Sequence, residues 1–161
     1  MSTIISKSIT DTLTNRPVSK VDWTKSPLKE VKMGGKNAVG DYGEHFVNNY
    51  YRDAGIDSHI IKKSHDVLAG TKKIEVKTAF QGKAGNFFFN QIYYEDPKTG
   101  VHKDWTHLAF VFVRPSSVEI WECERPSNPE EHFIINNGWS WNKNDPKKLT
   151  SIWKQIYSEE I

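Results

Sequence analysis

One short segment, residues 64–79 with the sequence SHDVLAGTKKIEVKTA, constrains the fold of this chain more than any other. Gly70 suits the first central position of a two-residue type II′ turn, which predicts a β-hairpin. Antiparallel pairing around that turn places Asp66 directly opposite Glu75. Because side chains alternate between the two faces of a strand, Lys77 shares a face with Glu75. The segment therefore predicts two acids and a lysine gathered on one side of a hairpin.

Two carboxylates in this arrangement repel each other. Cβ atoms of opposed residues lie about 5 Å apart, and at an effective dielectric constant near 20 the repulsion is roughly 3 kcal/mol. A hard divalent cation converts that repulsion into binding, since Mg²⁺ typically takes one or two protein carboxylates and keeps several waters. Lys77 would stand beside the metal-bound water, an arrangement suited to phosphodiester hydrolysis. The alternative is a surface hairpin with ordinary acids whose charge Lys77 offsets, because such short patterns recur by accident.

A helix is predicted before the hairpin. Residues 38–54 place apolar side chains at helical spacing, and Gly55 directly afterwards is a good stop. Glu44 falls at the edge of the apolar stripe, so its carboxylate is expected to lie along the core surface. A second helix is predicted over residues 145–157, because Asp145 is a good N-cap and apolar residues follow at helical spacing.

Strand patterns flank the hairpin. Ile60 and Ile61 mark a strand before it, residues 106–113 form a short apolar run typical of a buried strand, and residues 118–124 alternate as a strand does. The aromatic segment 87–94 fits either a strand or a helix. This order of elements predicts an α/β domain with a central mixed β-sheet of about five strands flanked by helices.

Composition bounds the class of protein. The 161 residues, 37% hydrophobic and 26% charged, suit one globular domain. Neither a signal-peptide layout nor an apolar stretch of membrane length is present, and the single Cys123 forms no internal disulfide, so we expect a cytoplasmic protein without a membrane partner. Residues 1–83 carry 14 Lys/Arg against 9 Asp/Glu, whereas residues 84–161 carry 8 against 11. The first half either presents a basic face to a polyanion or shows a chance imbalance on a solvated surface.

The hairpin and the helix before it resemble the PD-(D/E)XK nuclease superfamily, which has the restriction-endonuclease-like fold. The match is Asp66, eight residues, then Glu75-Val76-Lys77, with Glu44 in the preceding helix. The resemblance implies that Asp66, Glu75 and the Val76 carbonyl hold Mg²⁺, for which Mn²⁺ substitutes. It also implies that Lys77 acts on the attacking water and that Glu44 completes the catalytic site.

A second patch looks like small restriction-type members of that superfamily. It is the sequence FFFNQI at residues 87–92, followed by HLAFVFVRPSSVEIW. The resemblance implies that Gln91 belongs to the catalytic set and lies near the scissile phosphate or the DNA. It covers about residues 37–122 and departs from the motif at His65, which replaces the nominal proline.

Length and pattern predict one domain over residues 1–161: an irregular basic arm (1–36), a core (37–122) that the resemblance identifies as the nuclease part, and a C-terminal loop and helix (123–161). The implied activity is Mg²⁺-dependent endonucleolytic cleavage of double-stranded DNA, foremost by a type II restriction endonuclease. A homodimer is expected, because one active site cuts one strand, and no small-molecule cofactor is implied. The alternatives are a homing endonuclease, a junction resolvase or a nuclease toxin of the same fold, or a non-catalytic nucleic-acid-binding subunit.

Several polar residues around the predicted site are candidates for contacts with nucleic acid. They are Lys36, Lys83, Asn86, Asn90, Lys98 and Lys103. Contacts with phosphates give affinity without sequence specificity, and the alternative role for these residues is loop solubility. The six histidines show no metal-binding spacing, so surface or structural roles are expected for them.

Overall fold

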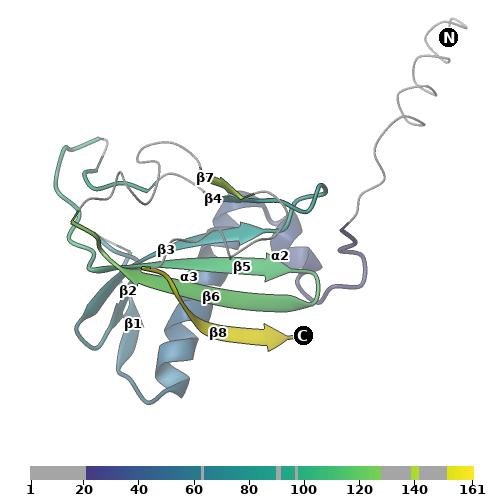
Figure 1. The fold of residues 1–161 in the computed structure, drawn as a ribbon, viewed down its shortest axis with the longest axis horizontal. Coiled ribbons are helices and arrows are strands. Elements are labelled where there is room, and N and C mark those ends of the chain that lie inside the picture. Colours follow the sequence, from purple (N-terminus) through teal and green to yellow (C-terminus); the bar gives the residue numbers. More distant parts are fainter. Residues whose placement is uncertain (1–20, 63, 90–91, 97, 128–138, 142–151) are drawn as a thin grey trace, which may run out of the picture.

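The computed structural model describes residues 21–62, 64–89, 92–96, 98–127, 139–141 and 152–161. Within them, the central sheet contains six strands in the spatial order β1-β2-β3-β5-β6-β8 (Figure 1). Those strands are β1 (Ser58–Ile60), β2 (Val67–Ala69), β3 (Lys72–Phe80), β5 (His107–Arg114), β6 (Ser117–Glu124) and β8 (Lys154–Glu160). The other elements are helices α2 (Lys29–Met33) and α3 (Gly35–Asp53) and the paired strands β4 (Phe87–Phe89) and β7 (Trp139–Trp141).

The sheet is mixed, as the sequence predicts, with one strand more than expected. β3 and β5 are parallel, and the other neighbouring strands of this sheet are antiparallel. The hairpin register is confirmed: Val67 pairs with Ile74, and Gly70 has a φ of 58° at the turn. Among the described residues, no helix is long and apolar enough to span a bilayer.

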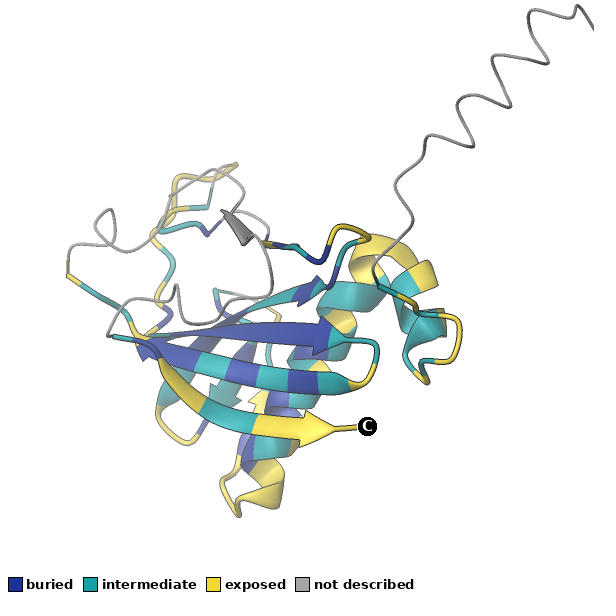
Figure 2. Cartoon of the chain, turned by 45° about the vertical axis from the view of Figure 1, so that its right-hand side comes forward, coloured by how far each residue is buried: buried dark blue, intermediate teal, exposed yellow. Residues whose placement is uncertain are grey.

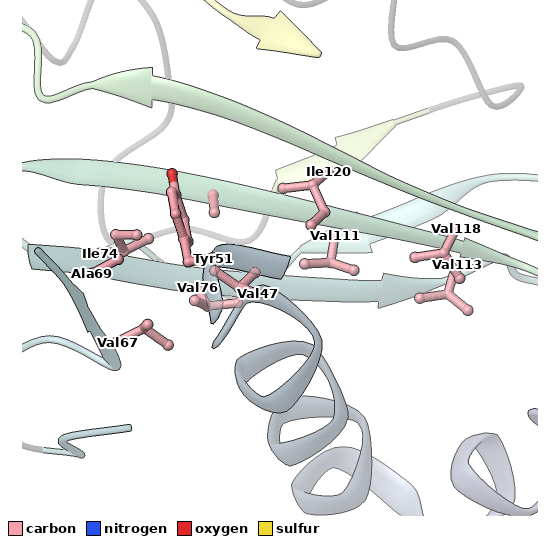
Figure 3. Close-up of a cluster of buried hydrophobic side chains, with 11 residues drawn as sticks. Val47, Tyr51, Val67, Ala69, Ile74, Val76, Val111, Val113, Val118 and Ile120 are labelled. Carbon is pink, nitrogen blue, oxygen red and sulfur yellow. The ribbon is translucent and has the colours of Figure 1, made fainter. Parts of the chain in front are cut away.

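Both faces of the sheet are covered, and β5 shows this most clearly. Leu108, Phe110 and Phe112 belong to a core cluster with Phe87 and Phe89 of β4. The intervening residues of β5 belong to a second cluster with α3, in which Val47 and Tyr51 contact the aliphatic side chains of the sheet (Figure 3). Burial on two faces explains why the sequence of β5 is a continuous apolar run instead of an alternating one. Figure 2 shows β5 buried along most of its length, whereas β8 is exposed toward its end.

Helix α3 lies unusually close to β3, and this brings Glu44 beside the hairpin. The contact is made at Gly43, which is buried against Thr78. A Cβ atom at position 43 would lie 1.7 Å from Thr78 Oγ1. Glycine is therefore required at this position by close packing and not by backbone conformation.

We expect Gly43→Ala to lower the free energy of unfolding by about 2–3 kcal/mol, because the helix must shift to accommodate the methyl group. Gly40→Ala is the matched control, since a Cβ there has no neighbour within 4 Å. That control is expected to raise stability by about 0.5–1 kcal/mol through helix propensity. Urea unfolding of both variants measures the difference. Equal stabilities would show that the contact between α3 and β3 is looser than described.

The predicted C-terminal helix is wrong where the structure describes it. Residues 154–160 form β8, which pairs antiparallel with β6, and residues 142–151 lie outside the described part of the chain. Tyr157 pairs with Ile120 and Gln155 with Trp121, so Ile156 is an extra residue in a β-bulge. Because of the bulge, the consecutive residues Ile156 and Tyr157 both pack against the same core cluster. Adjacent apolar residues that share one side are typical of an amphipathic helix, which is why the sequence pattern predicted a helix here.

Candidate active site

The site forms where β2 ends and leaves one edge of β3 open. β2 pairs with β3 only over residues 72–74, so beyond Ile74 the described partner of β3 is β5 alone. At that open edge the Val76 amide donates a hydrogen bond of 2.7 Å to Asp66 Oδ2. The N–H and C=O of one strand residue point to the same side, so the Val76 carbonyl also faces this edge.

Glu75 is the centre of the charged groups. Its side chain is only 1% exposed, and two ammonium groups hold it. Lys77 Nζ lies 2.7 Å from Glu75 Oε1. Lys103 Nζ, which comes from the loop before β5, lies 2.9 Å from both Glu75 oxygens. The sequence predicted that Lys103 contacts nucleic acid, whereas in the structure its ammonium pairs with Glu75.

The pKa values of the two carboxylates are shifted in opposite directions. Burial and then the charge of Glu75 raise the pKa of Asp66 to about 6. Burial also favours a higher pKa for Glu75, but Lys77 and Lys103 outweigh it and hold the pKa of that carboxyl below its usual value. Glu75 therefore stays charged to lower pH than Asp66, and Asp66 is the member that most needs a further cation.

Glu44 reaches the same site from α3. Its Oε2 atom is buried and accepts no hydrogen bond from the described residues. The Lys62 ammonium lies 3.6 Å from that oxygen, and burial raises the pKa of the Glu44 carboxyl. The charge of Glu44 also contributes to the raised pKa of Asp66. A buried carboxylate oxygen that accepts no hydrogen bond and lies near a second carboxylate is suited to binding a cation or a water of its hydration shell.

A cleft of about 500 Å³ opens onto these groups. Glu44, Asp66 and Lys77 lie along it together with the backbone edge of β3. Its remaining lining includes Lys32, Lys36 and Phe88. The cleft thus combines acids, ammonium groups and one exposed aromatic ring.

The donor set fits a hard divalent cation. Among the described residues, there is no group of three or more His, Cys, Asp or Glu side chains spaced to hold a metal ion. Asp66, Glu75 and the Val76 carbonyl supply two carboxylates and one neutral oxygen, and Mg²⁺ commonly binds through one or two carboxylates plus water. The free carboxylate oxygen of Glu44 could accept a hydrogen bond from such a water.

The structure brings together most, but not all, of the residues predicted to form the site. Lys36 lines the cleft. Lys83 and Lys98 are exposed, and the Asn86 carbonyl accepts a hydrogen bond from the Gly82 amide. Gln91 and Asn90 lie outside the described residues, so their predicted roles stay predictions.

Several residues that line the cleft were not predicted as site residues, and three of them have polar or aromatic side chains that suit a ligand. Lys32 donates a hydrogen bond of 2.9 Å to the Gln81 carbonyl, and Thr78 and Phe88 line the cleft wall. Alternation within β4 was the available signal for Phe88, because the buried Phe87 and Phe89 leave the residue between them facing outward. For Lys32 the available signal was its place in the predicted basic arm, residues 1–36.

Comparisons with known proteins add little to this geometry. No family model and no curated protein sequence matches the chain. Among solved structures, a bacterial homing endonuclease is similar over 71% of this chain and 80% of its own, with 12% sequence identity and a TM-score of 0.44. A likeness this low carries no argument about activity, which depends on the site itself.

Proposed function

We propose that this protein is a Mg²⁺-dependent endonuclease that hydrolyses phosphodiester bonds of double-stranded DNA, most specifically a type II restriction endonuclease. The observation that carries the proposal is the convergence of Glu44, Asp66 and Lys77 on one cleft at the open edge of β3, with the buried Glu75 carboxylate 2.7 Å behind Lys77. Two carboxylates and a lysine at such spacing have little structural reason to share a site. They match what metal-assisted phosphodiester hydrolysis requires.

The chain's own residues have distinct parts in the proposed reaction. A bound Mg²⁺ would supply charge neutralisation and activation of water. Asp66, Glu75 and the Val76 carbonyl would hold it, and Mn²⁺ would substitute for it. Lys77, held 2.7 Å from Glu75, orients the attacking water and stabilises negative charge on the phosphate. Glu44 accepts a hydrogen bond from a water at the back of the site.

The cleft also supplies groups that suit a polyanionic substrate. Lys36 is exposed on its rim, and the Lys32 ammonium is held over the Trp23 ring at 4.5 Å from its centroid. Both lysines suit phosphate contacts that position the duplex without specifying sequence. Two copies of the chain are needed to cut both strands at once, so we propose a homodimer.

Incubation of the protein with supercoiled plasmid and phage DNA tests the proposal. We expect discrete fragments with Mg²⁺ or Mn²⁺ and none with EDTA. Nicking alone, resolution of branched DNA or loss of RNA would replace restriction by another nuclease activity on the same site. DNA binding without cleavage under every metal condition would make the protein a non-catalytic subunit and refute the proposal.

A further inference from the structure

Lys103 forms an ion pair with a buried carboxylate instead of extending into solvent. Its ammonium is 2.9 Å from both oxygens of Glu75, a carboxylate that is itself 1% exposed. The Lys103 side chain is 18% exposed. This bidentate contact closes the side of the carboxylate that Lys77 leaves open, since Lys77 reaches only Oε1.

The loop holds Lys103 in this position. The Lys103 amide donates a hydrogen bond of 2.8 Å to the Tyr94 carbonyl, and the Arg125 guanidinium donates one of 2.6 Å to the Lys103 carbonyl. The next residue, Asp104, pairs with Lys73 of β3 at 2.5 Å. The Lys103 backbone is therefore held by hydrogen bonds to Tyr94 and Arg125, and the adjacent Asp104 side chain is anchored to β3.

The ammonium occupies the place that a metal bound to Glu75 needs. Mg²⁺ binds carboxylate oxygens at about 2.0–2.1 Å, and an ammonium 2.9 Å from both oxygens of the same carboxylate would lie almost against it. Two cations at that separation repel strongly inside a protein. A divalent cation on this face of Glu75 and the pairing of Lys103 with the same face thus exclude each other.

We propose that Lys103 is a resident counter-cation of the metal site, which neutralises Glu75 in the metal-free protein and is displaced when the divalent cation binds. The inference rests on the proposed function, because it assumes that Glu75 is a metal ligand. It has a physical benefit, since a buried carboxylate without a partner strongly destabilises a fold. The ion pair also lowers the affinity of the site for the divalent cation, because the entering cation must replace two charge-assisted hydrogen bonds.

Titration calorimetry with MgCl₂ and MnCl₂, without DNA, tests the inference. We expect Lys103→Met to bind metal at least about tenfold more tightly than the parent, since hydrogen bonds to charged groups are worth about 1.5–3 kcal/mol each. Lys103→Arg keeps the ion pair and is expected to stay within about twofold of the parent. Lys25→Met, which removes an exposed positive charge far from Glu75 in the sequence, should also stay within about twofold.

Thermal unfolding in EDTA gives a second readout. We expect Lys103→Met to melt below the parent without metal and to gain more than the parent when metal is added. Unchanged or weaker metal binding by Lys103→Met would overturn the inference while leaving the proposed function intact. Absence of metal binding in both parent and variant would overturn the inference together with the metal-dependent function. An equal increase in metal affinity in Lys25→Met would show that the effect comes from the net charge of the protein, and this would also overturn the inference.

Discussion

Replacing Lys77 by methionine is expected to lower the rate of DNA cleavage by at least about a thousandfold, within the range that a positioned acid–base group contributes. Methionine keeps the length of the side chain and removes its ammonium, which lies 2.7 Å from Glu75. The proposed reaction then lacks the group that orients water and stabilises negative charge. Single-turnover cleavage of a labelled duplex at saturating Mg²⁺ measures the chemical step separately from binding.

The matched control is Lys154→Met, an exposed lysine on β8 whose loss should leave the rate unchanged. Lys77→Met must also keep a circular dichroism spectrum close to that of the parent, and saturating Mg²⁺ removes any difference in metal affinity from the comparison. Cleavage by Lys77→Met at the rate of the parent would refute the role of this lysine. It would leave the carboxylate pair as the only supported part of the mechanism.

Asp66→Asn is expected to abolish cleavage and at the same time to stabilise the metal-free protein. An amide keeps the hydrogen bond from the Val76 amide but removes a negative charge that burial and Glu75 both oppose. We expect the free energy of unfolding in EDTA at pH 7.5 to rise by about 1–3 kcal/mol, and cleavage to fall by at least about a thousandfold. Urea unfolding and the same single-turnover assay measure the two effects.

The stabilisation should depend on pH with a definite sign. The pKa of Asp66 in the folded protein is raised to about 6 from an ordinary value of 3.8. The folded state therefore holds the proton more tightly, so the destabilisation from ionised Asp66 is absent below about pH 4 and complete above about pH 6. The difference between Asp66→Asn and the parent should grow across that interval. A difference that is constant from pH 4 to pH 7.5, or loss of stability at pH 7.5, would contradict the electrostatic strain assigned to this carboxylate.

The hairpin and its acids could be predicted because their geometry is local. Gly70 fixes the turn, and the turn fixes the register that pairs Val67 with Ile74. Asp66 comes directly before that pair and Glu75 directly after it, although Asp66 itself lies outside β2 and donates a hydrogen bond to the Ile74 carbonyl. The amphipathic pattern of residues 38–54 likewise predicted α3 and the placement of Glu44, although the helix begins at Gly35. In these segments, short-range pattern and tertiary environment favour the same structure.

Features that depend on contacts distant in sequence could not be predicted. Lys103 lies 28 positions after Glu75, and a loop held by Arg125 decides that the two side chains meet. In β8, pairing with the edge of β6 overrides a helical pattern of apolar residues. Trp153, predicted in that helix, stacks on Phe110 at 4.5 Å between ring centroids instead. Sheet pairing of this kind adds information that no local window of the sequence contains.

The one-sided access to the open edge of β3 limits what a single copy of the chain can reach. The chemical groups face one cleft, and the sheet's other edge at β8 is five strands removed from β1 in the same order. Under the proposed function, one molecule would therefore address one sugar–phosphate backbone at a time. The distance between the breaks in the two strands of a duplex would be fixed by the arrangement of two molecules in a dimer, or by the two positions at which one molecule binds in turn. It would not be fixed by the residues around Glu75.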